Sequence, residues 1–417
     1  MGLITENIQI KNLGTIITGG TPPTKKREFY GDVLPLIKPT DMSLGQRYIG
    51  TTEESLSDLG VERFKNKLVP KNTPCVVTIG TIGKSCLTKE TSLVNQAVNC
   101  VVVDSNKYDY MYVYYLMQLT IPKVKAKDSG TASGRENVSK SSFETIEVAP
   151  VKNINEQKKL GKVLSAYDEL IENNNRRIAI LEDMAQSLYR EWFVKFRFPR
   201  HQNTKFKESS LGLIPEGWGI GKLGDLTSKI GSGATPRGGK GAYKTEGIPL
   251  IRSMNIYDST FITKGLAFID DDQALKLQNV TVQAKDVLLN ITGASVARCA
   301  IVPTAFTPAR VNQHVAIIRV GGSDISPEYI LHTLISTVGK ARLLNIAQGG
   351  ATREAITKLH IENFEILIPP SGLHANFENL ASNTSLEKEV LFLKNENLKK
   401  QRDMLLPKLI TGKVKVD

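Results

Sequence analysis

The chain has 417 residues, more than one compact domain usually contains, so its length favours at least two hydrophobic cores. Its residues are 41% hydrophobic and 23% charged, and no apolar run approaches the ~20 residues that cross a bilayer, which argues against a membrane-spanning protein. The formal net charge of +12 favours a polyanionic partner, with nucleic acid before an anionic membrane surface. A basic globular protein without such a partner is the alternative.

The cysteines and histidines give no sign of a disulfide framework or a metal site. None of the four cysteines forms a C-x-x-C pair, and none of the five histidines belongs to an H-E-x-x-H motif. The N-terminus has no basic segment followed by an apolar one, so we expect no export signal. These patterns predict a cytoplasmic location, no bound metal, and free thiols at Cys75, Cys86, Cys100 and Cys299.

Residues 1–150 predict a mixed α/β domain with more strand than helix. A turn-rich stretch at 19–23 is followed at once by three basic residues. The apolar run 33–38 contains Pro35, which suits an edge strand or a strand start. Further along the chain we expect buried strands at 75–79 and 98–103, a helix at 108–119, a loop of small residues at 130–134 and a closing strand at 146–148.

The stretch 155–192 predicts one long helix. Its apolar positions follow one another at alternating steps of four and three, the spacing of a helix face that packs on another helix. Such a helix is roughly 57 Å long at 1.5 Å per residue. One polar residue interrupts the series, and polar residues at such positions can fix the register of paired helices. The series consists of Leu160, Leu164, Tyr167, Ile171, Asn174, Ile178, Leu181, Ala185, Leu188 and Trp192.

A polar, proline-broken stretch at 197–205 predicts a linker, after which the chain repeats itself. The Thr-Pro dipeptide at 21–22 returns at 235–236, and Asn95-Gln96 returns as Asn312-Gln313. Asp183-Met184 returns as Asp403-Met404, at an offset of 220 residues. Such a repeat predicts two homologous globular halves, each followed by a long helix. In the second half we expect strands at 287–291, 315–320 and 364–368 and a helical segment at 327–344.

The stretch 375–408 predicts the second long helix, with a weaker apolar face than the first. Its apolar positions lie one repeat after three of those in the first helix, so the two faces align. Lys394 takes the position equivalent to Asn174. We therefore expect the helices to pack on each other as an antiparallel coiled coil with an approximate two-fold axis. The alternative is that each helix packs on its own domain. The aligned residues are Leu391, Leu398 and Leu405.

Three motifs resemble those of a known family. Residues 188–196 (LYREWFVKF) end the first long helix, 211–218 (LGLIPEGW) open the second half, and 405–414 (LLPKLITGKV) lie near the C-terminus. With the two-fold repeat, they resemble the specificity subunit of a type I restriction–modification system over the whole chain. The resemblance implies a target recognition domain at 1–150, a central spacer helix at 151–198, a linker at 199–212, a second target recognition domain at 213–370 and a C-terminal spacer helix at 371–417.

The resemblance also implies what each part does. The two domains would read the two halves of a bipartite, asymmetric site in double-stranded DNA, and the helices would set the spacer and dock two methyltransferase subunits. Endonuclease/translocase subunits would join that complex. The chain itself would bind no cofactor, because S-adenosylmethionine, ATP and Mg would belong to partner subunits. Helix pairing and docking are assigned to Leu160, Leu164, Tyr167, Ile171, Asn174, Ile178, Leu181, Leu188, Trp192, Leu391, Leu398 and Leu405.

Two other functions compete with this interpretation. A self-contained DNA methyltransferase or nuclease would need a cofactor or metal site, and a coiled-coil scaffold with two protein-binding heads would not need the positive charge. The sequence has no Asn/Asp-Pro-Pro-Tyr/Phe segment of the kind used by amino-methyltransferases. Residues 80–85 (GTIGKS) resemble part of a phosphate-binding loop, but Thr78 stands where the motif needs glycine, which favours a strand–turn element. We therefore expect no catalytic residue.

The candidates for DNA binding are cationic or amide side chains. Those that recur in both halves cannot distinguish two half-sites, so we assign them to phosphate contacts, with solvated surface charge as the alternative. They are Lys25, Lys26, Arg27, Lys38, Lys84, Arg135, Lys140, Arg237, Lys240, Lys244, Arg252, Arg298, Arg353 and Lys358. Base readout is expected where the halves diverge, from Gln46, Arg47, Arg63, Lys65, Asn255, Tyr257 and Gln278.

Overall fold

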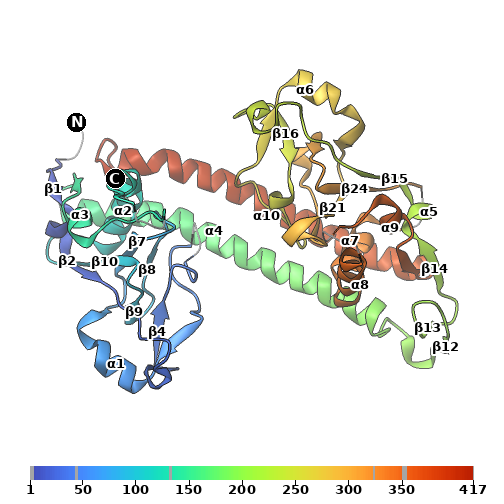
Figure 1. Cartoon of the computed structure of the whole chain (residues 1–417), viewed down its shortest axis with the longest axis horizontal. Coiled ribbons are helices and arrows are strands. Elements are labelled where there is room, and N and C mark those ends of the chain that lie inside the picture. The colour runs from blue at the N-terminus through green and yellow to red at the C-terminus, as the bar shows by residue number, and fades with distance from the viewer. Residues whose placement is uncertain (1–3, 43–45, 131–133, 323–324, 350–354, 417) are drawn as a thin grey trace. The chain divides into compact units, whose positions relative to one another are not determined.

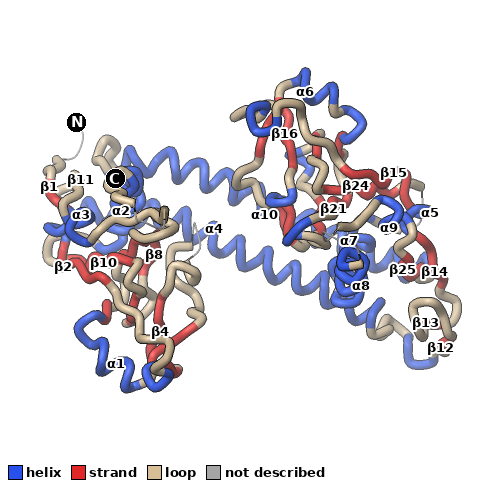
Figure 2. The backbone as a smooth tube through the Cα atoms, viewed as in Figure 1, coloured by secondary structure: helices blue, strands red, loops and turns tan. Residues whose placement is uncertain are grey.

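The computed structural model describes residues 4–42, 46–130, 134–322, 325–349 and 355–416, apart from the side chain of Lys240. The chain divides into two compact units. Unit 1 comprises Met1–Asn175 and Leu393–Asp417, and unit 2 comprises Arg176–Phe392. Each unit contains a globular domain and one segment of each long helix. Figure 1 labels the elements, and Figure 2 colours the helices and strands of each unit.

The domain of unit 1 is built on two sheets. Its strands are β1 (Ile8–Gln9), β2 (Gly14–Thr18), β3 (Tyr30–Gly31), β4 (Leu34–Ile37), β5 (Glu54–Leu56), β6 (Leu68–Val69), β7 (Pro74–Val77), β8 (Ser85–Leu87), β9 (Ser92–Val94), β10 (Val98–Val103) and β11 (Glu147–Val148). An antiparallel sheet has the order β2-β10-β7-β8, and a mixed sheet has the order β3-β5-β4-β9-β6. β1 pairs with β11. The strands predicted at 75–79, 98–103 and 146–148 are thereby confirmed.

One helix covers the antiparallel sheet of unit 1. The helices are α1 (Asp58–Phe64), α2 (Tyr110–Lys125) and α3 (Lys140–Glu144), with 3-10 turns η1 (Ile10–Leu13), η2 (Arg27–Phe29) and η3 (Lys65–Lys67). α2 packs on β7 and β8 and buries the aromatic side chains of Tyr112, Tyr114 and Tyr115. It begins at Tyr110 because the Asp109 carboxylate accepts the backbone N–H of Tyr112. The predicted helix at 108–119 is confirmed and continues to Lys125. The predicted loop at 130–134 lies partly outside the described residues.

The position of Pro35 in its sheet corrects the expectation of an edge strand. Pro35 lies in β4, an inner strand of its sheet and not an edge. β4 pairs with β5 from Leu34, but with β9 only from Leu36 onward. The ladder to β9 therefore needs no donor from the proline nitrogen. The second part of the expectation, a strand start, is confirmed.

The domain of unit 2 repeats both sheets. Its strands are β12 (Phe206–Lys207), β13 (Ile214–Pro215), β14 (Gly219–Lys222), β15 (Thr227–Ser232), β16 (Ile248–Ile251), β17 (Ile256–Tyr257), β18 (Thr260–Phe261), β19 (Ala267–Ile269), β20 (Thr281–Val282), β21 (Val287–Asn290), β22 (Cys299–Ile301), β23 (Ala309–Val311), β24 (Val315–Val320) and β25 (Glu365–Ile368). The orders β15-β24-β21-β22 and β19-β16-β23-β20 correspond to β2-β10-β7-β8 and β5-β4-β9-β6 of unit 1. The predicted strands of this half are confirmed, and the repeat extends to the topology of the sheets.

The predicted helical segment of unit 2 contains a break. The helices are α5 (Leu223–Leu226), α6 (Asp271–Lys276), α7 (Pro327–Ile335), α8 (Thr337–Gln348) and α9 (Lys358–Glu362), with 3-10 turns η6 (Gly239–Ala242), η7 (Ser253–Asn255), η8 (Gln278–Val280), η9 (Gly293–Ser295) and η10 (Thr304–Phe306). The helical segment predicted at 327–344 is confirmed, but it consists of two helices, α7 and α8. It is broken at Ser336, whose hydroxyl accepts the N–H of Gly339 and starts α8.

The two long helices are α4 (Ile154–Tyr189), which ends in a π-helical turn η4 (Arg190–Val194), and α10 (Ser371–Ile410). In unit 1, Asp168 and Asn174 of α4 contact Arg402 and Asn395 of α10. Residues further along α4 contact residues earlier in α10, so the two segments run antiparallel. Unit 2 has the same order, with Glu182 beside Lys388 and Tyr189 beside Phe377.

The end of α4 and the start of the second half share one core in unit 2. Phe193 is 2% exposed and lies 5.8 Å from Trp218, 5.0 Å from Tyr329 and 5.1 Å from Phe377, measured between ring centroids. The linker between the motifs contains the 3-10 turn η5 (His201–Asn203) and the β12–β13 pair. Mixed α/β domains with two long helices are thus confirmed. In the described part of the chain, no helix has the length and apolar character needed to span a bilayer.

Candidate functional site

Equivalent turns in the two domains are held by equivalent hydrogen bonds. In unit 1 the Thr21 hydroxyl donates to the side-chain oxygen of Gln96 and accepts from Asn95 Nδ2 at 2.8 Å. In unit 2 the Thr235 hydroxyl donates to Gln313 in the same way. The sequence repeat identified both motifs but not their contact with each other. These hydrogen bonds hold the backbone of each turn in place, and the basic residues follow directly after it in the chain.

The cations after the first turn remain accessible. Lys25 and Lys26 are exposed. Arg27 is also exposed, with its guanidinium 5.4 Å from the ring centroid of Tyr30 and 3.8 Å from a carboxylate oxygen of Glu54. An exposed ion pair of this length contributes little and is readily exchanged for another anion. All three side chains can therefore reach a phosphate.

The second turn carries a similar set of cations. Arg237 is exposed, and Lys244 is exposed with its ammonium 3.7 Å from Asp270. Lys240 lies in η6, but its side chain is outside the described part of the structure. Two of the three predicted cations in this half are thus placed on the surface.

Lys38 and Arg252 follow β4 and β16 and already have protein partners. Lys38 Nζ lies 2.8 Å from Glu53 and 3.4 Å from Glu54, and the hydrogen bond with Glu53 raises the pKa of Lys38. Arg252 lies 5.2 Å from the ring centroid of Tyr243 and donates to the carbonyl of Gly265. Binding a phosphate at either position would require exchange of these contacts.

The GTIGKS stretch is a turn between two antiparallel strands, as the strand–turn interpretation predicted. β7 ends before it and β8 begins at Ser85, and no helix follows to present backbone N–H groups to a phosphate. Lys84 donates to the carbonyl of Pro39 at 2.7 Å. Arg298, its counterpart, lies 4.3 Å from the ring centroid of Tyr257. Both cations are half-buried beside their turns.

The last pair of shared lysines begins equivalent short helices. Lys140 of α3 lies 3.5 Å from Glu144, and Lys358 of α9 lies 3.3 Å from Glu362. All four residues belong to the helices' outer faces. Arg135 is exposed, and Arg353 lies outside the described residues. Of the proposed base readers, Gln46 is half-buried, whereas Arg63, Lys65, Tyr257 and Gln278 are exposed.

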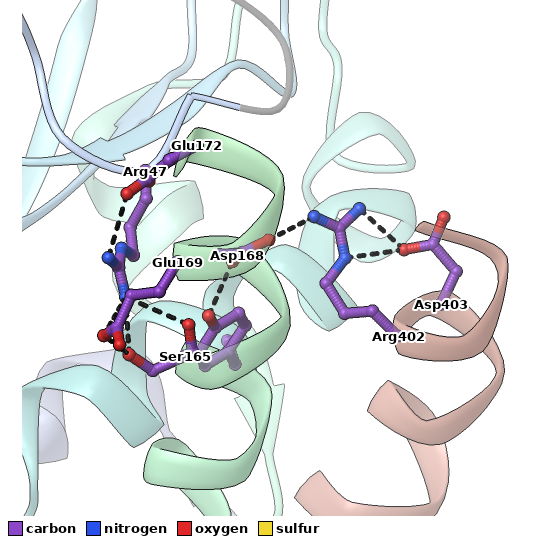
Figure 3. A network of polar contacts seen from close by, with 8 residues as sticks. Arg47, Ser165, Asp168, Glu169, Glu172, Arg402 and Asp403 are labelled. Atoms are coloured by element: carbon purple, nitrogen blue, oxygen red, sulfur yellow. Dashed lines mark hydrogen bonds and ion pairs between the residues drawn. The ribbon is translucent and has the colours of Figure 1, made fainter. Parts of the chain in front are cut away.

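Arg47 is a correction to the predicted base readers. It is only 5% exposed, and its guanidinium is turned toward α4 (Figure 3). It donates to the Ser165 hydroxyl and lies 3.2 Å from Glu169 and 3.0 Å from Glu172. Because the guanidinium is buried and faces two carboxylates, it is not presented to a base. Arg47 instead fastens the domain of unit 1 to its helix segment.

Asn255 is a second correction. The side chain is fully buried, where its oxygen accepts the N–H of Arg252 at 3.0 Å and its nitrogen donates to the carbonyl of Ile262 at 2.9 Å. Its donor and acceptor capacity therefore stabilises the loop after β16. The sequence predicts that the amide of Asn255 reads a DNA base, because it lies where the two halves diverge. In the structure the side chain stabilises a local turn of its own backbone.

The polar residue of the first helix pairs with an asparagine of the second helix. Asn174 is buried and donates to Asn395 at 2.9 Å, and Asn395 donates to Asn175 at 2.8 Å. Lys394, the position equivalent to Asn174, is exposed. Asn395 is the repeat equivalent of Asn175, so the contact joins equivalent positions.

The other assigned helix residues differ in burial. Leu160, Leu164, Ile171 and Leu391 are buried, whereas Tyr167, Ile178, Leu181, Leu188, Trp192, Leu398 and Leu405 are partly exposed. Ion pairs between the helices were not predicted from the sequence: Asp168 with Arg402 in unit 1 (Figure 3), and Glu182 with Lys388 and Arg177 with Glu387 in unit 2. A charge on a helix is normally solvated, so only the pairing of the helices could have identified them.

No group of three or more His, Cys, Asp or Glu side chains suited to a metal ion occurs among the described residues. All four cysteines are free and buried. Burial raises the pKa of the Cys299 thiol, which keeps it in the unreactive protonated form.

The comparisons with known proteins agree on one family. The family described as "Type I restriction modification DNA specificity domain" matches residues 5–183. The MjaIX specificity subunit of a type I restriction enzyme from Methanocaldococcus jannaschii is 28% identical over 98% of this chain and 93% of its own. The HindI specificity subunit from Haemophilus influenzae is 31% identical over 42% of this chain and 38% of its own.

A solved structure supports the fold. The type I restriction–modification S subunit from M. genitalium superposes with a TM-score of 0.60 over 98% of this chain and 96% of its own, at 14% identity. The sequence matches, the internal repeat and this shared fold agree. The chain is therefore similar in sequence to specificity subunits of type I restriction enzymes and shares the fold of one of them.

Proposed function

We propose that this chain is the DNA-specificity subunit of a type I restriction–modification complex and recognises a bipartite, asymmetric DNA target through its two domains. The observation that carries the proposal is a pair of domains with the same strand orders and with cations at equivalent positions, whose remaining loops differ in sequence. Shared cations suit the phosphates common to both half-sites, and differing loops suit different bases. The chain itself acts in recognition and not in catalysis.

The partners in this proposal are two methyltransferase subunits and endonuclease/translocase subunits, assembled in the cytoplasm. The partner subunits bind S-adenosylmethionine, ATP and Mg. Exposed apolar residues on the helices support two equivalent docking surfaces. Leu170 and Met404 are 52% and 57% exposed in unit 1, and their repeat equivalents Val390 and Met184 are 42% and 58% exposed in unit 2.

Native mass spectrometry of the assembled methyltransferase tests this docking. Met184→Glu and Met404→Glu should each remove one methyltransferase subunit, because a buried, unpaired carboxylate opposes an apolar contact. Met254→Glu is the matched control, since Met254 is 49% exposed but lies in the 3-10 turn η7 of the unit 2 domain, away from both long helices in the sequence. Full stoichiometry in both helix variants would contradict the assignment.

Methylome sequencing of the native system tests recognition. We expect one methylated motif with two specified half-sites around an unspecified spacer. Replacing the domain at 213–370 by that of a relative should change one half-site only. Removing seven residues from each long helix should change the spacer and leave both half-sites intact. A single contiguous motif, or an unchanged spacer, would overturn the proposal.

The two competing functions make different predictions. A self-contained methyltransferase or nuclease would modify or cut DNA as the purified chain alone. A scaffold with two protein-binding heads would leave no footprint on DNA, and its binding would depend little on salt, unlike phosphate contacts.

A further inference from the structure

Two ion pairs between the long helices occupy equivalent positions of the repeat, whereas the exposed pair of Arg177 and Glu387 has no charged counterpart. Asp168 on α4 contacts Arg402 on α10 in unit 1, and Glu182 on α4 contacts Lys388 on α10 in unit 2. The offset of 220 residues that relates the two Asp-Met motifs also relates Asp168 to Lys388 and Glu182 to Arg402. Each pair is thus the repeat counterpart of the other, with its charges reversed.

Both pairs are shielded from water. The side chains of Asp168 and Arg402 are 5% and 14% exposed, and those of Glu182 and Lys388 are each 17% exposed. Each carboxylate also accepts a hydroxyl at 2.6 Å, from Tyr115 at Asp168 and from Ser259 at Glu182. Like charges facing each other in such surroundings would be strongly unfavourable.

The distribution of the charges between the helices is uneven. α4 carries an acid at both positions, and α10 carries a base at both. If a second α4 took the place of α10, Asp168 of one copy would face Glu182 of the other, twice per pair. If a second α10 replaced α4, Lys388 would face Arg402 in the same way. Only the pairing of α4 with α10 brings opposite charges together.

We propose that these two ion pairs select the partner of each long helix, so that the half of the chain carrying α4 associates with the half carrying α10 and rejects a second copy of itself. The selectivity is independent of the DNA target and of the proposed function. It concerns which halves assemble into one two-domain protein. Repulsive contacts in the wrong complex are a recognised source of specificity.

The energetics of Lys388 fit a role in selection. Burial lowers the pKa of Lys388 to about 8, so the attraction of Glu182 does not fully offset the loss of hydration. Buried ion pairs of this kind contribute little net stability compared with apolar contacts. They have a large effect on the stability of a helix pair when a residue of like charge takes the place of the native partner.

The test starts from the full chain with a specific protease site inserted at 201–203, in the linker. Cleavage of the folded protein gives an N piece, which carries α4, and a C piece, which carries α10. The nicked protein is unfolded in urea and refolded, and native mass spectrometry then counts the N·C, N·N and C·C pairs.

Two matched double variants separate selection from stability. D168K/R402E and E182K/R402E each exchange one acid of α4 for lysine and carry the same net charge. Both make N·N and C·C pairs attractive at every position. D168K/R402E keeps opposite charges in both N·C contacts, whereas E182K/R402E places like charges in both. All other side chains of the two helices are the same in the three proteins.

We expect wild type to give at least a tenfold excess of N·C over the self-pairs. D168K/R402E should form N·C and self-pairs together, and E182K/R402E should form mainly self-pairs. Abundant N·N and C·C pairs in wild type would overturn the proposal. So would N·C pairs alone in D168K/R402E, which keeps opposite charges in both N·C contacts and therefore remains informative if E182K/R402E fails to refold.

Discussion

The two units hold their segments of α4 by different chemistry. In unit 1 the segment buries Leu160 and Leu164 and is held in addition by polar contacts. Arg47 binds three side chains of α4 (Figure 3), and Asp168 contacts both Tyr115 and Arg402. In unit 2 the end of α4 is held by aromatic packing around Phe193 and Tyr189. Two domains with the same fold can therefore hold a long helix by different contacts, because polar side chains and aromatic rings can both fix a helix against a domain.

Removing an aromatic ring from unit 2 should have the largest effect. Phe193→Ala leaves a cavity among Trp218, Tyr329 and Phe377, which should lower the free energy of unfolding of unit 2 by about 3–5 kcal/mol. Both tryptophans, Trp192 and Trp218, lie in unit 2, so the fluorescence change in urea follows that unit alone.

Phe206→Ala is the control for this measurement, since Phe206 is 47% exposed and packs on Phe196 at one edge. It should change the fluorescence midpoint much less. If Phe193→Ala and Phe206→Ala lowered the free energy of unfolding of unit 2 equally, the aromatic cluster would not be what holds the end of α4.

The polar fastening of unit 1 should be the next most sensitive. Arg402→Met leaves the Asp168 carboxylate buried with only the Tyr115 hydroxyl, at a cost of about 3 kcal/mol. Lys388→Met in unit 2 should cost less, because burial already lowers the pKa of Lys388 to about 8. Amide hydrogen exchange of α2 and of α7 reports the two units separately. A greater loss of exchange protection in α7 of the Lys388→Met variant than in α2 of the Arg402→Met variant would contradict this order of effects.

These contacts explain what the sequence could and could not predict. The long helices could be predicted because their apolar residues recur at steps of three and four. The aromatic cluster around Phe193 was not predicted, because its members come from segments far apart in the sequence. Arg47 and Asn255 were misassigned, since an arginine or asparagine in a diverging loop has the same sequence signature whether it faces DNA or its own protein. The break at Ser336 was missed because apolar periodicity continues across it, and only the capping bond distinguishes the two helices.

A third effect depends on pH and is specific to unit 2. Burial lowers the pKa of His332 to about 4 from about 6.5 in an unfolded chain. Between these values the folded state binds fewer protons, so the stability of unit 2 is complete above pH 6.5 and falls as the pH drops toward 4. The loss should reach about 3 kcal/mol. The tryptophan signal in urea at pH 7 and pH 4.5 measures it, with His332→Leu as the variant that lacks the titrating group. A parallel pH dependence in both proteins would contradict the assignment to His332.

The smallest effect concerns the outer surfaces, where the two domains remain alike. Lys26→Ala and Arg237→Ala remove exposed cations that follow equivalent turns. If both contact phosphates, each should weaken binding to every DNA sequence by a similar factor and reduce the slope of log K against log salt by about 0.9. Fluorescence anisotropy with cognate and scrambled duplexes at several salt concentrations measures both quantities. A change confined to the cognate duplex, with an unaltered slope, would instead make that residue a base reader and would end the equivalence of the two turns.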